Sequence, residues 1–329
     1  MDKEGFRQFL ETRKLTEDQM KQHFEMVERF EAFLSNFNPS TTLERCGAEE
    51  TRGFVDKLVM DGECSYVNLL PVARYSYYKK NFPVYLAIVE LLDGYEAFEG
   101  MYKKVGQVLG EQKREEIFNN IDLPSLGVAN WQKAQLTRTV MQRLEECVDE
   151  QAYREIFSDS FRDLPDSSYL NDKIRYEEIG DFDKFLEWKR QEFIHELETI
   201  KAEGRLFFNQ EITEEVLDLV RMNPEIAEGV RQGNTLYVTK IPYMAKEYLA
   251  ETDPNKKRYF YCHCPWARES LRQEEGPVSV KFCKCSAGYH KKPWEVILDQ
   301  KLEAEVVESV LQGDLRCRFA IFLPDTILK

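Results

Sequence analysis

The sequence predicts an α+β protein with more than one domain, in which an all-helical N-terminal region precedes a small antiparallel sheet with helices. Its 329 residues exceed one average domain, and a hydrophobic content of 43% is enough for packed cores. Apolar residues recur mainly at helical spacing up to residue 233, and β-rich runs begin at Leu236. We therefore predict helical regions over 1–100 and 101–233 and an α+β domain over 234–329, which can recruit helices from 170–233.

Four helices are predicted within residues 1–100. Thr16 and Gln19 are spaced as a capping box at the start of the first long helix. The apolar positions that follow at helical spacing are Met20, Phe24, Val27, Phe30 and Leu34. Further helices are expected over 49–60 and 64–80, and Pro83 suits the first turn of a fourth.

The remaining elements are predicted from changes in periodicity. We expect a long helix over 182–206 and a short one from Asn223-Pro224 to Gly233. Strands are expected over 236–242, 258–264, 278–283, 302–310 and 316–323. A short helix is expected over 244–249, and a longer one over 286–299. Together these predict an antiparallel sheet crossed by helices.

Composition excludes several functional classes. No apolar run approaches the roughly 20 residues that a membrane span requires, and the first residues contain no apolar signal region. We therefore expect a cytoplasmic protein that has no membrane partner and keeps its eight cysteines reduced. The sequence has no glycine-rich phosphate loop, so no nucleotide cofactor is expected. Oligomeric state is not predicted.

The N-terminal helices resemble the core-binding, SAM-like domain of tyrosine recombinases and integrases. The similar stretch runs from Phe9 to about Lys80, and it includes the helix that ends with Phe30, Phe33 and Leu34. The recombinase catalytic residues have no visible counterpart in this chain. A structural helical bundle is the alternative interpretation of the same pattern.

Charge argues against DNA as a partner. Residues 1–100 carry 12 basic and 18 acidic side chains, a net charge of −6, and the whole chain has a net charge of −14. Arg74, Lys79 and Lys80 form the one basic cluster in this region of the sequence. Because DNA affinity depends largely on counterion release, three contacts predict little binding at physiological salt.

The C-terminal part concentrates five of the eight cysteines, within residues 262–317. It resembles vinyl-reductase-type domains and L-2-amino-thiazoline-4-carboxylate hydrolase-like proteins. The shared features are the segment from Cys285 to Tyr289, an acidic strand that ends at Glu308, and Gly313-Asp314 followed by Cys317 and Phe319. Cys264-Pro265 followed by Ala267 is similar to the start of the hydrolase-like proteins. The resemblance implies a domain that binds small, often aromatic molecules.

Zinc is a possible cofactor, because some members of this fold hold structural zinc. Those members place a cysteine three residues after the glutamate, whereas this chain has Leu311 three residues after Glu308. The chain instead has the pairs Cys262/Cys264 and Cys283/Cys285. Residues i and i+2 of a strand share one face, so neighbouring strands would bring four thiols together as metal ligands. The alternative is four packed, protonated thiols.

Two residues are candidates for catalysis and seven for ligand binding. Cys285 is the candidate nucleophile, and His290, about one helical turn later, could polarise it or bind a metal. Aromatic walls and cations for a small carboxylate ligand would come from Arg258, Trp266, Arg268, Phe282, Tyr289, Trp294 and Phe319. Lys291 and Lys292 add positive charge beside them.

Three functions are compatible with these observations, in the following order. The first is a small-molecule or metal-binding module that acts as a sensor. The second is a cysteine- or metal-dependent hydrolase of a small heterocyclic or amide acid. The third is DNA binding through the integrase-like helices. Whether the protein is an enzyme is left open.

Overall fold

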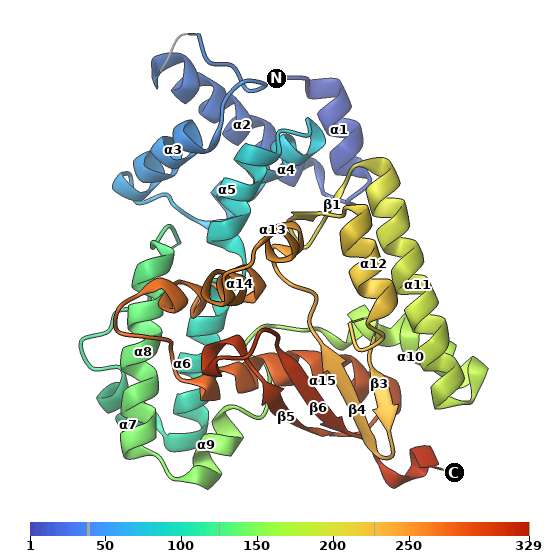
Figure 1. The fold of residues 1–329 in the computed structure, drawn as a ribbon. Coiled ribbons are helices and arrows are strands. Elements are labelled where there is room, and N and C mark those ends of the chain that lie inside the picture. The colour runs from blue at the N-terminus through green and yellow to red at the C-terminus, as the bar shows by residue number, and fades with distance from the viewer. Residues whose placement is uncertain (38–39, 125, 227, 329) are drawn as a thin grey trace. The chain divides into compact units, whose positions relative to one another are not determined.

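A computed structural model describes residues 1–37, 40–124, 126–226 and 228–328 of the chain (Figure 1). Contacts within the chain define two compact units. Unit 1 comprises Met1–Tyr95 and Pro124–Ala129, and unit 2 comprises Glu96–Leu123 and Asn130–Lys329. Within the described ranges, no helix has the length and apolar character needed to cross a bilayer.

Unit 1 is helical. Its elements are α1 (Lys3–Glu11), α2 (Glu17–Phe37), α3 (Ala48–Met60), α4 (Tyr66–Tyr78) and α5 (Phe82–Leu92). The predicted capping box is confirmed, because the backbone N–H of Gln19 donates to Thr16 Oγ1 at 3.3 Å and that of Thr16 donates to Gln19 Oε1 at 2.9 Å. Apolar side chains from all five helices form one core.

Two of the three residues in the predicted basic cluster, Arg74 and Lys79, have partners within unit 1. Arg74 Nη1 donates to His23 Nε2 at 2.9 Å, and Lys79 lies 3.7 Å from the carboxylate of Asp2. These two cations therefore have intramolecular partners, which leaves less positive charge for a phosphate backbone.

Unit 2 contains the remaining helices and both sheets. Its helices are α6 (Glu96–Leu109), α7 (Glu111–Ile117), α8 (Asn130–Cys147), α9 (Glu150–Ile156), α10 (Leu170–Ile179), α11 (Phe182–Glu203), α12 (Glu214–Met222), α13 (Ala245–Ala250), α14 (Pro254–Tyr261) and α15 (Lys284–Leu298). A small hairpin pairs β1 (Leu206–Phe207) with β2 (Gln210–Glu211). The fold class predicted from the sequence, a helical N-terminal region followed by an α+β part, is confirmed.

The main sheet has four antiparallel strands in the order β3-β4-β6-β5. These are β3 (Val230–Gln232), β4 (Thr235–Thr239), β6 (Arg318–Phe322) and β5 (Glu303–Glu308). Helix α15 packs against β5 and β6, and it runs beside the sheet in Figure 1. Trp294 of α15 lies in the core that this contact forms, together with Leu236 and Ile321.

Three predicted elements are wrong. Residues 258–264 are not a strand, because Asp253 accepts hydrogen bonds from the N–H groups of Asn255 and Lys256 and so caps helix α14, which begins at Pro254. Residues 278–283 are not a strand either. Ser279 Oγ accepts a bond from the Lys281 N–H, and Val280–Cys283 is a 3-10 turn that leads into α15.

The third error is the short helix expected from Asn223 to Gly233. The described residues there form a turn after α12 and then strand β3. Glycines at 229 and 233 have φ values of 106° and 61°, which end regular structure on both sides of β3. Val230 pairs with Tyr237 across the resulting hairpin.

Candidate functional site

The cysteines that were predicted to lie on two strands lie instead at helix ends. Cys262 and Cys264 follow α14, whereas Cys283 and Cys285 lie at the start of α15. Cys262, Cys264 and Cys317 nevertheless belong to one apolar cluster, and Cys264, Cys283 and Cys285 pack against a second. The strand-face argument was therefore wrong, but helix ends bring these thiols together.

Burial keeps the thiols of Cys262, Cys283 and Cys285 protonated at neutral pH. It raises the pKa of Cys262 to about 12 and that of Cys285 to about 11, and it raises the pKa of Cys283 well above the ordinary value. Cys283 shares a hydrogen bond of 3.3 Å with Ser309, and the backbone N–H of Phe161 donates to Cys285 Sγ at 3.3 Å. A nucleophile or metal ligand would have to be the thiolate, which burial disfavours here.

No three His, Cys, Asp or Glu side chains are arranged to hold a metal ion within the part of the chain that the structure describes. The zinc prediction therefore has no ligand set to support it. Catalysis by Cys285 and His290 likewise remains a prediction, because no hydrogen bond joins these two side chains among the described contacts.

Two glycines bring a distant segment against the start of α15. A Cβ atom at Gly288 would lie 2.4 Å from the carbonyl carbon of Asp159 and 2.5 Å from the backbone nitrogen of Ser160. A Cβ atom at Gly100 of α6 would lie 2.1 Å from the carbonyl oxygen of Phe161. Only glycine permits such close approaches of backbone, so the segment 159–161 is held between α6 and α15.

Lys240 directly follows strand β4, and its ammonium contacts the start of α15. Its ammonium donates to Ser286 Oγ at 3.2 Å and lies 5.9 Å from the centroid of the Phe319 ring. Its backbone N–H donates to the carbonyl of Cys317 at 3.1 Å. Lys240 is half-buried, and none of the described carboxylates lies within ion-pair distance of its ammonium.

Two histidines face Lys240 and are neutral. Burial and the charge of Lys240 lower the pKa of His263 to about 3 and lower that of His290 well below its ordinary value. His263 Nε2 donates to the carbonyl of Ile241 at 2.6 Å. The ring of His290 stacks on Phe319, with centroids 5.0 Å apart and an interplanar angle of 24°.

Two arginines add positive charge to the same region. Both Arg162 and Arg268 lower the pKa of His263 further, through their charges. The guanidinium of Arg162 lies 5.9 Å from the Tyr289 ring centroid, and that of the buried Arg268 lies 4.7 Å from the ring centroid of Tyr243. We call Lys240, Ser286, His263, His290, Phe319, Tyr289, Arg162 and Arg268 the Lys240 site.

Comparisons with known proteins give no match. No protein-family model matches the chain, and neither do the curated proteins or the solved structures with which it was compared. Both family resemblances therefore remain expectations from the sequence, and function is argued below from the geometry of the Lys240 site.

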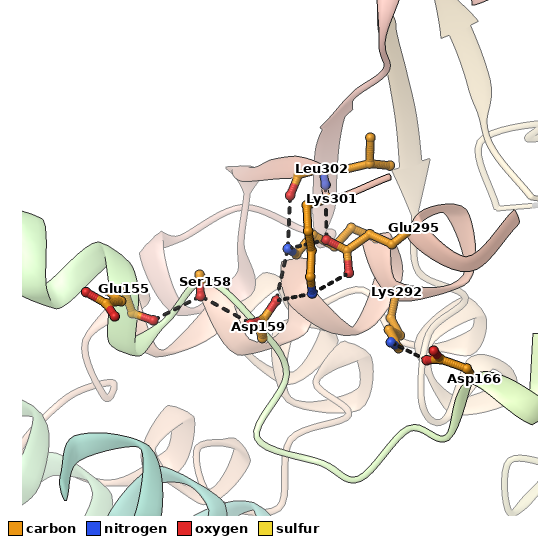
Figure 2. Close-up of polar contacts among 9 residues, drawn as sticks. Glu155, Ser158, Asp159, Asp166, Lys292, Glu295, Lys301 and Leu302 are labelled. Atoms are coloured by element: carbon orange, nitrogen blue, oxygen red, sulfur yellow. Dashed lines mark hydrogen bonds and ion pairs between the residues drawn. The ribbon is translucent and has the colours of Figure 1, made fainter. Parts of the chain in front are cut away.

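The lysines that were expected to add charge near the ligand are neutralised within unit 2. Lys291 is buried and its ammonium lies 2.8 Å from Glu295 Oε1 and 3.0 Å from Asp159 Oδ1. Lys292 pairs with Asp166 at 2.5 Å. Figure 2 shows the Lys292–Asp166 pair beside α15, together with Asp159 and Glu295. Asp159 belongs to the segment that Gly288 contacts, and its carboxylate pairs with Lys291. The charges of Lys291 and Lys292 are therefore compensated by carboxylates within unit 2, which leaves them poor candidates for binding a carboxylate ligand.

Most of the other predicted ligand-binding residues lie elsewhere. Trp266 is buried against Phe98, with ring centroids 4.7 Å apart, and Arg258 donates to Asn255 at 2.6 Å near the start of α14. Phe282 and Trp294 are core residues. Of the predicted set, Arg268, Tyr289 and Phe319 lie at the Lys240 site, together with His290.

Sequence reasoning missed the centre of the site. Lys240 carried a weak signal, since it is a charged residue directly after an apolar strand and before Ile241-Pro242. Ser286 lay within the motif used for the C-terminal resemblance but was given no role. Arg162 had no signal, because only the folded chain brings residues so distant in sequence together.

Proposed function

We propose that unit 2 is a small-molecule-binding module whose ligand is an organic acid, with its carboxylate bound by Lys240 and Ser286. The observation that carries this proposal is Lys240, a half-buried residue whose ammonium lies within ion-pair distance of none of the described carboxylates. Two other shielded lysines of unit 2 differ in this respect, Lys189 and Lys291. Lys189 lies 2.8 Å from Asp172, and Lys291 lies 2.8 Å from Glu295.

An anion at this position has a physical basis. Removing an ammonium from water is costly unless an opposite charge compensates, and no described carboxylate lies within ion-pair distance of the Lys240 ammonium. A bound carboxylate would supply the missing charge through a charge-assisted hydrogen bond to Lys240. Ser286 accepts from Lys240, so its own O–H can donate to the second carboxylate oxygen.

The surrounding rings favour a ligand with a flat apolar part. Phe319 and His290 stack nearly parallel, and Tyr289 meets the His290 ring at an interplanar angle of 77°. Phe319 is 1% exposed and belongs to a core cluster, so the proposed contacts of an aromatic ligand are with Tyr289 and His290, which are half-buried. We therefore propose a small aromatic acid, in agreement with the ligand class expected from the sequence.

Binding without turnover is the better-supported form of this function. Burial raises the pKa of Cys285 to about 11, so its thiol is protonated at neutral pH. The neutral His290 forms no described hydrogen bond to that thiol. Nothing else in the Lys240 site supplies an activated nucleophile, so no observation favours the hydrolase alternative.

Thermal unfolding of the full chain with phenylacetate, phenylacetamide and inorganic phosphate tests the proposal. Phenylacetate at about ten times its Kd should stabilise the protein by about 1.4 kcal/mol, which corresponds to an increase in Tm of a few degrees. The amide lacks the charge and should have little effect. Inorganic phosphate should also have little effect. If it stabilises the protein as much as phenylacetate does, the site binds anions in general and the proposal of an aromatic acid is wrong.

Two lysine variants locate the effect. Lys240→Met should abolish stabilisation by phenylacetate, whereas Lys256→Met, at an exposed lysine 3.8 Å from Glu251, should retain it. The proposal is wrong if a broad set of small aromatic acids gives no shift. It is also wrong if phenylacetate stabilises the wild type and the Lys240→Met variant equally.

A further inference from the structure

The Lys240 site contains a buried polar atom that has no partner. His290 Nε2 is shielded from solvent, and it forms no hydrogen bond with any described residue. Buried polar atoms in native proteins are nearly always satisfied, and an unsatisfied one destabilises the fold. The atom is therefore a candidate contact for a molecule that is not part of the chain.

His290 and Ser286 lie on the same face of α15. They are four residues apart in the helix, so their Cβ atoms are separated by roughly 5–6 Å. Ser286 accepts the hydrogen bond from Lys240, and the charge of Lys240 also reaches the His290 ring. A ligand whose carboxylate is bound at Lys240 and Ser286 would thus place neighbouring atoms near His290 Nε2.

We propose that His290 is the second anchor of the ligand and that the ligand is a hydroxy acid, with its hydroxyl on a carbon next to or near the carboxylate. This inference rests on the proposed function. A hydroxyl both donates and accepts, so it can pair with Nε2 in either neutral tautomer of the imidazole. Because Ser286 and His290 lie one helical turn apart, we place the hydroxyl close to the carboxylate, as in 2- and 3-hydroxy acids.

The same contact would set specificity. An acid without the hydroxyl leaves His290 Nε2 unsatisfied in the complex, whereas the hydroxy acid satisfies it. A site that is built to form a hydrogen bond rejects analogues that lack the group, because its own polar atom stays unpaired. The Phe319 ring holds His290 in place by stacking, so the imidazole does not have to be ordered when the ligand binds.

Mandelate and phenylacetate are a matched pair of probes, since they differ by one hydroxyl next to the carboxylate. Calorimetric titration of the full chain should give a Kd for mandelate that is about tenfold lower than that for phenylacetate. In His290→Phe the ratio of the two Kd values should fall to about one, while phenylacetate still binds. In His290→Gln, whose amide can reach the position of Nε2, part of the preference should return.

The outcomes separate this inference from the proposed function. If phenylacetate binds and requires Lys240 but mandelate binds no tighter, His290 is not a second anchor and only this inference fails. The same conclusion follows if the preference persists in His290→Phe. If neither acid binds the wild-type chain, the proposed function fails and this inference fails with it. The wild-type ratio alone can overturn the inference, so the test does not depend on how well the variants fold.

Discussion

Lys291 of α15 and Lys240, which contacts Ser286 of the same helix, should respond differently to substitution by methionine. Lys291 is 5% exposed, and its partner Glu295 is also 5% exposed. Lys291→Met leaves that carboxylate buried with a weaker partner, Lys301, at 3.4 Å. Removing one member of a buried pair costs about 3–5 kcal/mol, so the free energy of unfolding should fall by about 3 kcal/mol.

Lys240→Met removes a cation that no described carboxylate compensates. The substitution loses one hydrogen bond to Ser286, which is worth about 1.5–3 kcal/mol because the donor is charged. It also removes the cost of shielding the ammonium, which can reach several kcal/mol for a fully buried ion and is smaller for this half-buried one. The two terms nearly cancel, so we expect a net change between about −1 and +1 kcal/mol.

Urea denaturation can measure this difference. All four tryptophans, Trp131, Trp188, Trp266 and Trp294, belong to unit 2, so their fluorescence reports the unfolding of this unit. The midpoint should fall clearly for Lys291→Met and change little for Lys240→Met, with the slope of each transition unchanged. If both variants lose the same free energy of unfolding, Lys240 is a structural cation and the argument for a missing anion is refuted.

Four further predictions follow from the geometry. Gly288→Ala should lower the free energy of unfolding by about 1–3 kcal/mol or more in urea denaturation, because the added Cβ would overlap the backbone of Asp159 and Ser160. Gly47→Ala is the control, since a Cβ there would meet only Glu50 Oε2, at 3.7 Å. An equal loss of stability in both variants would contradict the steric explanation. The folded-state pKa of His263 lies near 3, below its unfolded value of about 6.5, so its contribution to stability is present above pH 6.5 and should fall by about 1–2 kcal/mol between pH 7 and pH 5. His263→Gln should reduce the total loss by that amount, and His290, whose pKa is also lowered, accounts for further loss in the same direction. Iodoacetamide at pH 7.5 should modify the exposed Cys147 at once and the buried Cys262 only after unfolding, as followed by mass spectrometry. Fluorescence anisotropy with random duplex DNA should show no submicromolar, salt-sensitive binding, and such binding would restore the integrase-like interpretation.

The elements that could be predicted from sequence are those with local signals. Thr16 and Gln19 mark the start of α2, and Pro83 lies in the first turn of α5, as expected from residues that act within one turn. The predicted strand at 258–264 failed because alternating aromatic and cysteine residues suggested period two. The decisive local signal is Asp253-Pro254, an N-cap residue followed by a proline in the first turn of α14.

The site was harder to predict than the elements. The cysteine pairs were visible in the sequence, but their protonation follows from burial, which periodicity does not give. The importance of Lys240 depends on which acidic side chains lie near it in the fold, and no sequence pattern provides this information. Arg162 reaches the site only because Gly100 and Gly288 allow backbone to approach backbone.

Unit 1 is not continuous in sequence, and this affects how the chain can be made and divided. The chain leaves unit 1 after Tyr95, forms α6 and α7, and then contributes 124–129, where Leu126 packs on the helical core and Gly127 lies against Val59. During synthesis, the first 95 residues therefore leave the ribosome well before the segment that completes their core. A truncation at residue 95 would expose apolar surface on unit 1 rather than release an intact domain, whereas a fragment that ends beyond residue 129 would retain the whole unit.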